Sequence, residues 1–253
     1  MELAGANLAG CILADANLTG ANLKGANLKG AVLANTALKG ANLSDVKLEG
    51  VDLSAADLTG AAVRSPDSLP PDVKQILSDH FEWIRSDGRR GSRAKLAKAD
   101  LTYINLAGAD LSGCDLNGAN LTGANLSKTS FVMSDLSGTN LAGADLSQAK
   151  LDGINLAKAD LSTARLAGAQ LGPVDIKDSK GKPTGRKWPS NLAGCKLNGA
   201  DLSGANLEYA NLGHADFSNA NLTKANLTSA NLTDARMDGA VLDGAAFDRV
   251  SAS

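Results

Sequence analysis

Leucine recurs at every fifth residue over most of the chain, and this spacing dominates the hydrophobic pattern. Three registers carry it, with leucines or other apolar residues at five-residue steps over 3–63, 96–176 and 192–247. Together they make 42 units, and 36 of them have Leu at this position, which is called the centre below. The six other centres are also apolar: Val63, Phe131, Ile176, Phe217, Met237 and Phe247.

A second apolar position lies two residues before each centre, where 28 of the 42 units have Ala. Neither position holds a charged residue, although 21% of the chain is charged, so both are expected to point away from water. Five residues advance a helix by roughly 500°, which would scatter the leucines around its surface. Two apolar positions that are two residues apart fit an extended segment, because alternate side chains of a strand point to the same face. With a period of five, however, the leucines of successive units would point to opposite faces of a straight strand. The chain must therefore bend once per unit.

Glycines are frequent two residues after the centre, as at Gly10 and Gly20, and supply the backbone freedom that such corners need. The unit Ala-Asn/Asp-Leu-x-Gly, as in residues 21–25, resembles the pentapeptide repeat family. This resemblance implies an all-β solenoid, a right-handed quadrilateral β-helix with four units per coil. About ten coils at ~4.8 Å each would give a rod roughly 50 Å long. A solenoid of this kind says little about function.

Residues 64–93 interrupt the repeat and contain a predicted amphipathic α-helix from Pro71 to Ser86. Its apolar residues have helical spacing: Val73, Ile76, Leu77, Phe81 and Ile84. The segment resembles one that precedes the solenoid in many bacterial members of the family, which implies that the helix covers the open end of the following tract. The predicted domains are then a first solenoid tract at 1–63, a helical insert at 64–93 and a main solenoid at 94–253. One continuous rod with the helix packed on a face is the alternative.

A second interruption, a polar loop at about 177–189, is rich in turn residues and is predicted to protrude. Residues 172–189 carry five basic and two acidic groups, so the loop is a local positive region in a chain with a formal charge of -2. That overall charge excludes the basic excess of a general nucleic-acid binder. The amino terminus has no leader pattern and no apolar run is long enough to span a bilayer, so we expect a cytoplasmic bacterial protein without a membrane partner.

Candidate chemistry is sparse. Cys11, Cys114 and Cys195 lie at the small inward position and are expected to be buried apolar side chains, without disulfides or metal. Only His80 and His214 are histidines, and neither accompanies a nucleophile motif. We therefore expect no enzyme activity, no cofactor and no metal site. The Asn or Asp before each centre is expected to bond to nearby backbone at the corner.

The favoured function is a scaffold that binds a protein partner through a solenoid face or the loop. Arg186, Lys187 and Trp188 are the first candidate contact, because an aromatic side chain beside arginine suits the centre of an interface. A second basic cluster includes Arg85, Arg89 and Arg90. It either binds an acidic partner or forms a solvated collar around the helix end.

The alternative function rests on resemblance to bacterial quinolone-resistance proteins, whose acidic rods imitate duplex DNA and engage DNA gyrase. That mechanism needs dense negative charge along one face. In steps of 20 residues, Asp115, Asp135 and Asp175 align but Asn155 interrupts them, and cations dilute other columns. Open coil edges also predict end-to-end association into a homodimer.

Overall fold

The computed structural model describes residues 1–53, 56–58, 61, 63–178 and 180–251. Outside the interruptions, short parallel β-bridges join units that are 20 residues apart, as from Asn120 to Asn140 and from Asn140 to Asp160. A separation of 20 residues is four units, so each coil has four sides. The predicted right-handed quadrilateral β-helix is confirmed.

The interior is filled by the centres and by the small residues two positions before them. Leu101, Leu121 and Leu141 stack on one another in successive coils and are buried. Where a hydroxyl residue replaces Ala, it donates a hydrogen bond to the previous coil, as from Thr129 Oγ1 to the Leu106 carbonyl at 2.8 Å. Ser134 Oγ donates in the same way to the Leu111 carbonyl at 2.9 Å, so these buried polar groups are satisfied.

The corners show why the repeat tolerates so few residue types. The residue two after the centre has a positive φ, +64° at Gly118 and +60° at Lys128. The residue before the centre accepts a hydrogen bond from the backbone two residues later, as Asn125 Oδ1 does from the Ser127 N–H at 3.2 Å. The expected role of the Asn and Asp residues at the corners is therefore confirmed.

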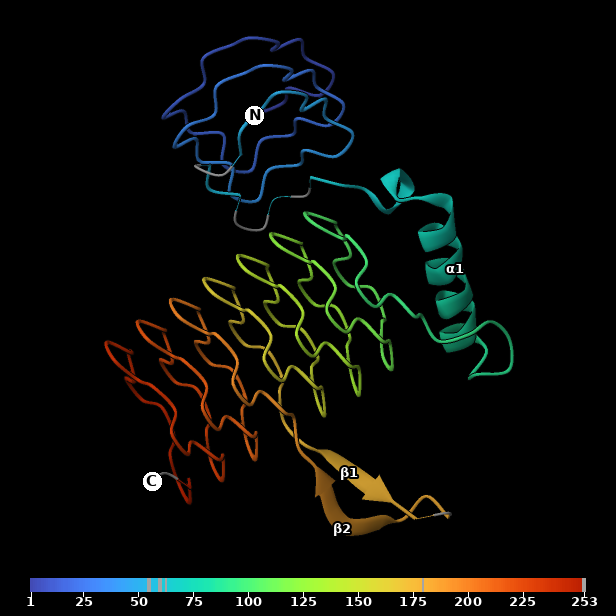
Figure 1. The fold of residues 1–253 in the computed structure, drawn as a ribbon, viewed down its shortest axis with the longest axis vertical. Coiled ribbons are helices and arrows are strands. Elements are labelled where there is room, and N and C mark those ends of the chain that lie inside the picture. The colour runs from blue at the N-terminus through green and yellow to red at the C-terminus, as the bar shows by residue number, and fades with distance from the viewer. Residues whose placement is uncertain (54–55, 59–60, 62, 179, 252–253) are drawn as a thin grey trace.

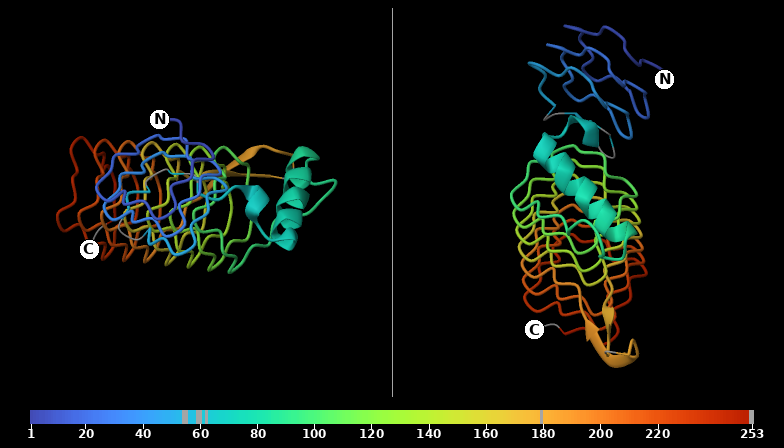
Figure 2. Two further views of the ribbon diagram at one scale, coloured as in Figure 1. Left: turned by 90° about the horizontal axis from the view of Figure 1, so that it is seen from above. Right: turned by 90° about the vertical axis from the view of Figure 1, so that its right-hand side faces the viewer.

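Two separate hydrophobic cores divide the solenoid into a first tract within residues 1–63 and a second tract within 94–251. Between them lie a short 3-10 helix η1 (Pro66–Ser68) and the helix α1 (Pro71–Arg85). Leu69 and Leu77 join the core of the second tract, and α1 lies against its first coils (Figures 1 and 2). The axes of the two stacks do not line up in Figure 1, so the tracts do not form one straight rod.

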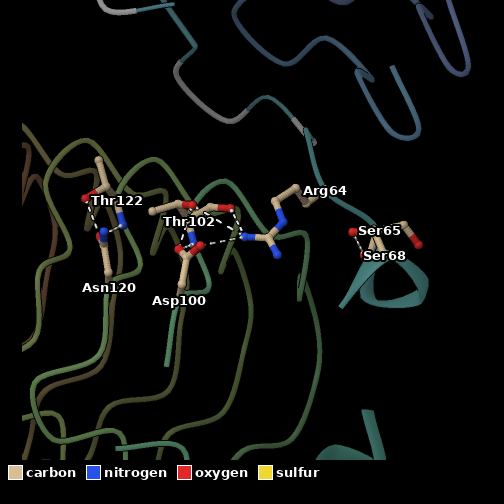
Figure 3. Close-up of polar contacts among 7 residues, drawn as sticks. All are labelled: Arg64, Ser65, Ser68, Asp100, Thr102, Asn120 and Thr122. Atoms are coloured by element: carbon tan, nitrogen blue, oxygen red, sulfur yellow. Dashed lines mark hydrogen bonds and ion pairs between the residues drawn. The ribbon is translucent and has the colours of Figure 1, made fainter. Parts of the chain in front are cut away.

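Arg64 connects the first tract to the edge of the second. Its N–H donates to the Tyr103 carbonyl at 2.9 Å and its carbonyl accepts from the Asn105 N–H at 2.8 Å, so Arg64 adds a short strand to the first coil. Its guanidinium group lies 3.4 Å from Asp100 Oδ2 and contacts Thr102 (Figure 3). Partial burial acts to raise the pKa of Asp100, but hydrogen bonds from Thr102 and the charge of Arg64 hold it below its usual value.

The second interruption is an antiparallel hairpin of β1 (Val174–Lys177) and β2 (Pro183–Trp188), rather than an irregular loop at 177–189. Its start overturns two expectations. Ile176 is not the centre of a repeat unit but a residue of β1 outside the core, and Asn191 rather than Asp175 pairs with Asn155. Asp175 is therefore not in the column of Asp135. The repeat ends here because Pro173 has no N–H to donate to the next coil, as other corner residues do.

Candidate functional site

The base of the hairpin brings three apolar side chains together above a glycine. A methyl group on Gly153 would lie 2.7 Å from Met133 Sδ, 2.9 Å from Val174 Cγ2 and 3.3 Å from Trp188 Cδ1. The absence of a side chain at Gly153 therefore lets Met133 in the previous coil meet the paired residues Val174 and Trp188. Ser190 ties the returning strand to the solenoid, since its hydroxyl lies 3.1 Å from both the Leu151 and Gly172 carbonyls.

Large apolar side chains are unusually exposed around this base. Met133 is 46% exposed, Trp188 54% and Tyr209 40%. Tyr209 lies on the other side of the hairpin, where Lys187 Nζ is 5.4 Å from its ring and 3.4 Å from Asp175 Oδ1. We call Met133, Val174, Trp188 and Tyr209 the hairpin base patch.

A cleft of about 380 Å³ opens beside Trp188. Trp188, Ile154 and Pro189 form its apolar part, and three asparagines form its polar part. These asparagines make a ladder: Asn191 Nδ2 donates to Asn155 Oδ1 at 3.1 Å, and Asn211 Nδ2 donates to Asn191 Oδ1 at 3.2 Å. Because the amides bond to each other across coils, the polar wall is held in place before any ligand arrives.

The three residues predicted in the loop have different surroundings. Trp188 belongs to the patch and borders the cleft. Lys187 is engaged by Asp175 and by the ring of Tyr209. Arg186 is exposed and makes no ion pair within the described part of the chain. The indole and the free guanidinium are therefore the groups that remain open to a partner.

The second predicted cluster is partly paired with neighbouring carboxylates. Arg90 lies 2.7 Å and Arg85 4.0 Å from Glu82 carboxylate oxygens, and Arg89 lies 3.5 Å from Asp87. These pairs favour the interpretation as a solvated collar. The collar lies at the end of α1, beside the first coils of the second tract, whereas the hairpin leaves the solenoid further along the chain (Figure 1).

Sequence reasoning missed Met133 and Tyr209. Both stand two residues after a centre, at the corner where Gly or a polar residue is usual, and both have positive φ, +57° and +61°. The sequence already shows a bulky apolar residue at each of these two corner positions, and this departure from the repeat is the signal that could have identified both.

Two of the three cysteines and one of the two histidines are buried. Burial raises the pKa of the Cys114 and Cys195 thiols to about 12, so both remain protonated near neutral pH. His80 is buried, its Nδ1 accepts the Ala94 N–H at 3.2 Å, and its Nε2 lies 3.4 Å from Cys114 Sγ. Across the described ranges, no three His, Cys, Asp or Glu side chains gather as a metal site would require.

A helix that crosses a membrane must be both long and predominantly apolar. No helix in the part of the chain that the structure describes is both long and apolar enough to cross one.

The fold and the site together define a class, a four-sided β-solenoid that carries an exposed apolar patch at an inserted hairpin. Its family follows from the repeats themselves. The family model described as pentapeptide repeats matches in eight copies, over residues 2–40, 26–62, 92–127, 104–143, 139–172, 190–223 and 220–252. The chain belongs to the pentapeptide repeat family. The matches leave out α1 and the hairpin, which are this chain's additions to the repeat.

Solved structures of the same family are similar to this chain. HetL, from the cyanobacterium Nostoc sp. strain PCC 7120 and involved in heterocyst differentiation regulation, is 30% identical; the match covers 97% of this chain and 86% of HetL, with a TM-score of 0.36. The plasmid-mediated fluoroquinolone resistance protein QnrB1 is 16% identical, and the match covers 98% of this chain and 89% of QnrB1, with a TM-score of 0.39. No curated protein matches the chain significantly.

Proposed function

We propose that this protein is a non-catalytic scaffold that binds a protein partner at the hairpin base patch. The observation that carries the proposal is the gathering of half-exposed Met133, Trp188 and Tyr209 around one hairpin. Methionine and aromatic side chains are enriched in protein interfaces, and exposed apolar groups with a polar rim mark interaction sites. The scaffold proposal needs no reactive group.

The solenoid supports this use by holding the patch rigid. Met133 and Tyr209 stand on coils whose backbones bond to the coils after them, Met133 through its N–H to the Asp152 carbonyl and Tyr209 to the Thr228 carbonyl, both at 3.0 Å. A surface that is ordered before binding loses little conformational entropy when a partner arrives. The neighbouring cleft adds a concave surface beside the patch.

Imitation of DNA toward gyrase, the alternative from the sequence, gains no support from the surface charge. After Asp135, the same column continues with amides rather than carboxylates: Asn155, Asn191, Asn211 and Asn231. On another face Asp160 is followed by Lys196, whose Nζ lies 3.2 Å from the Asp160 carboxylate. Neither column has the run of unpaired negative charge that DNA imitation requires.

Replacement of Trp188 by Ala tests the proposal. Proteins that co-purify with the wild type from cells of the source organism should be lost from Trp188→Ala, while the melting temperature stays close to that of the wild type because the indole is half exposed. Asn219→Ala is the matched control, since Asn219 is an exposed corner residue two units from Tyr209, at the diagonal corner. Equal capture by Trp188→Ala and the wild type would contradict the proposal.

A further inference from the structure

The hairpin is positively charged although the whole chain is not. Residues 174–188 contain five basic and two acidic side chains, against a formal charge of -2 for the complete sequence. The excess is therefore local to the element that carries Trp188. Within the hairpin and its turn, the charged residues are Asp175, Lys177, Asp178, Lys180, Lys182, Arg186 and Lys187.

Most of these cations form no ion pair with the residues that the structure describes. Lys187 pairs with Asp175, and Asp178 is used by the turn, where its Oδ1 accepts the N–H groups of Lys180 at 2.8 Å and Lys182 at 2.9 Å. The others are exposed and form no ion pair with any described residue: Lys177, Lys180, Lys182 and Arg186. A partner with carboxylates would supply what the protein itself does not.

The strand edges of the hairpin are less suited to binding than its side chains. The pairing between β1 and β2 shifts register between Asp175 and Lys177, and Gly185 within β2 has a φ of +77°. A bulge twists the edge of a sheet, and lysines along it discourage the addition of another strand. The contact is then made by side chains, with the apolar patch at the base and the cations toward the turn.

The apolar part of the site distinguishes a protein from a polyanion. Asp152 and Glu208 stand on the coils beside the hairpin base, whereas the cleft beside Met133 is balanced, with Asp115 and Asp135 facing Arg93 and Lys95. The carboxylates of Asp152 and Glu208 would repel a nucleic-acid backbone or an anionic membrane laid across the base. A short protein segment can place an apolar side chain at the base and direct its acidic residues toward the turn alone.

We propose that the hairpin binds an acidic protein segment, with a bulky apolar side chain in the cleft beside Trp188 and neighbouring carboxylates on Arg186 and the lysines of the turn. This inference rests on the proposed function, because it assumes that the hairpin base patch is the contact site. It adds the chemical character of the partner. Exposed ion pairs contribute little each, so the apolar anchor provides most of the affinity and the charges provide selectivity.

Peptide libraries test this inference with the full-length protein. One fluorescent library has carboxylates on both sides of a central apolar pair, and two matched libraries have Lys or Ser in place of the carboxylates. Anisotropy should show binding of the acidic library, weaker binding of the serine library and none of the lysine library. Arg186→Ala should weaken acidic binding by about twofold to fivefold, and higher salt should weaken it further. Lys224→Ala removes an exposed cation from another corner and should have no effect.

The outcomes separate the two proposals. Equal binding of the acidic and serine libraries, with loss of both in Trp188→Ala, would overturn the acidic partner and leave the contact site in place. Binding that Trp188→Ala does not change would overturn the contact site itself. Tighter binding of a duplex DNA probe or of vesicles containing phosphatidylserine than of the acidic library would overturn the assignment to a protein.

Discussion

Truncation of Leu121 to Ala is the sharpest test of how the solenoid is held together. Leu121 is fully buried between Leu101 and Leu141 of the neighbouring coils. Leu242 occupies the same repeat position in the last described coil but is 39% exposed. The two substitutions are chemically identical, so a difference between their effects measures burial and packing alone.

The expected magnitude follows from this burial. Removal of a fully buried leucine side chain loses about 2 kcal/mol of transfer free energy, and the cavity left between stacked coils raises the cost to about 3–5 kcal/mol. Leu242 packs against a coil on one side only, so Leu242→Ala should cost about 1 kcal/mol.

Urea unfolding followed by circular dichroism measures both costs. Leu121→Ala should shift the main transition to lower urea without changing its slope, and Leu242→Ala should shift it much less. Costs within about 0.5 kcal/mol of each other would show that the leucines do not share one dry interior, and the reasoning from the repeat would be refuted.

Three further predictions concern the hairpin, the helix and the junction. Gly153→Ala should destabilise the fold more than Gly138→Ala and should change the fluorescence of Trp188. Both glycines have positive φ, but of the two only Gly153 has side-chain neighbours within 4 Å, so equal effects would contradict the packing described. Burial lowers the pKa of His80, so its contribution to stability is complete above about pH 6.5 and is lost as pH falls toward the lowered pKa of the folded state. Urea midpoints measured across this range should show a smaller loss in His80→Gln, and an unchanged pH dependence would contradict this assignment. Arg64→Ala should lower the free energy of unfolding by at most about 1 kcal/mol, because Asp100 is largely exposed. It should also speed hydrogen exchange at the Asn105 amide, and unchanged exchange would contradict the role of Arg64 as an edge strand.

The repeat made most of the fold predictable because each residue type has one task. Leu and Ala fill the interior, Asn and Asp bond to corner backbone, and the residue two after the centre takes a positive φ. The predicted helix over Pro71–Ser86 corresponds to α1 within a residue of its end. Four units per coil came from family resemblance rather than from the period, since a spacing of five does not determine how many corners close a coil.

The hairpin base could not be predicted because it depends on contacts between coils. Ile176 continues the spacing of five, and the sign that the coil ends before it is Pro173, which has no N–H to donate and cannot take the positive φ of a corner residue. This break moves Asp175 out of its column and sets Trp188 beside Met133, which precedes it by 55 residues. The arrangement of the two tracts could not be predicted for the same reason, because it depends on the contact between Arg64 and Tyr103 rather than on any repeat position.

Site-specific photo-crosslinking tests the central claim most directly. Benzoylphenylalanine placed at Tyr209, beside the hairpin, should form a covalent adduct with a discrete protein in living cells of the source organism. The same probe at Asn219, a corner residue with nearly the same φ two units away, should form none. Adducts at Asn219 that equal those at Tyr209, or none at Tyr209, would contradict binding at the hairpin base patch.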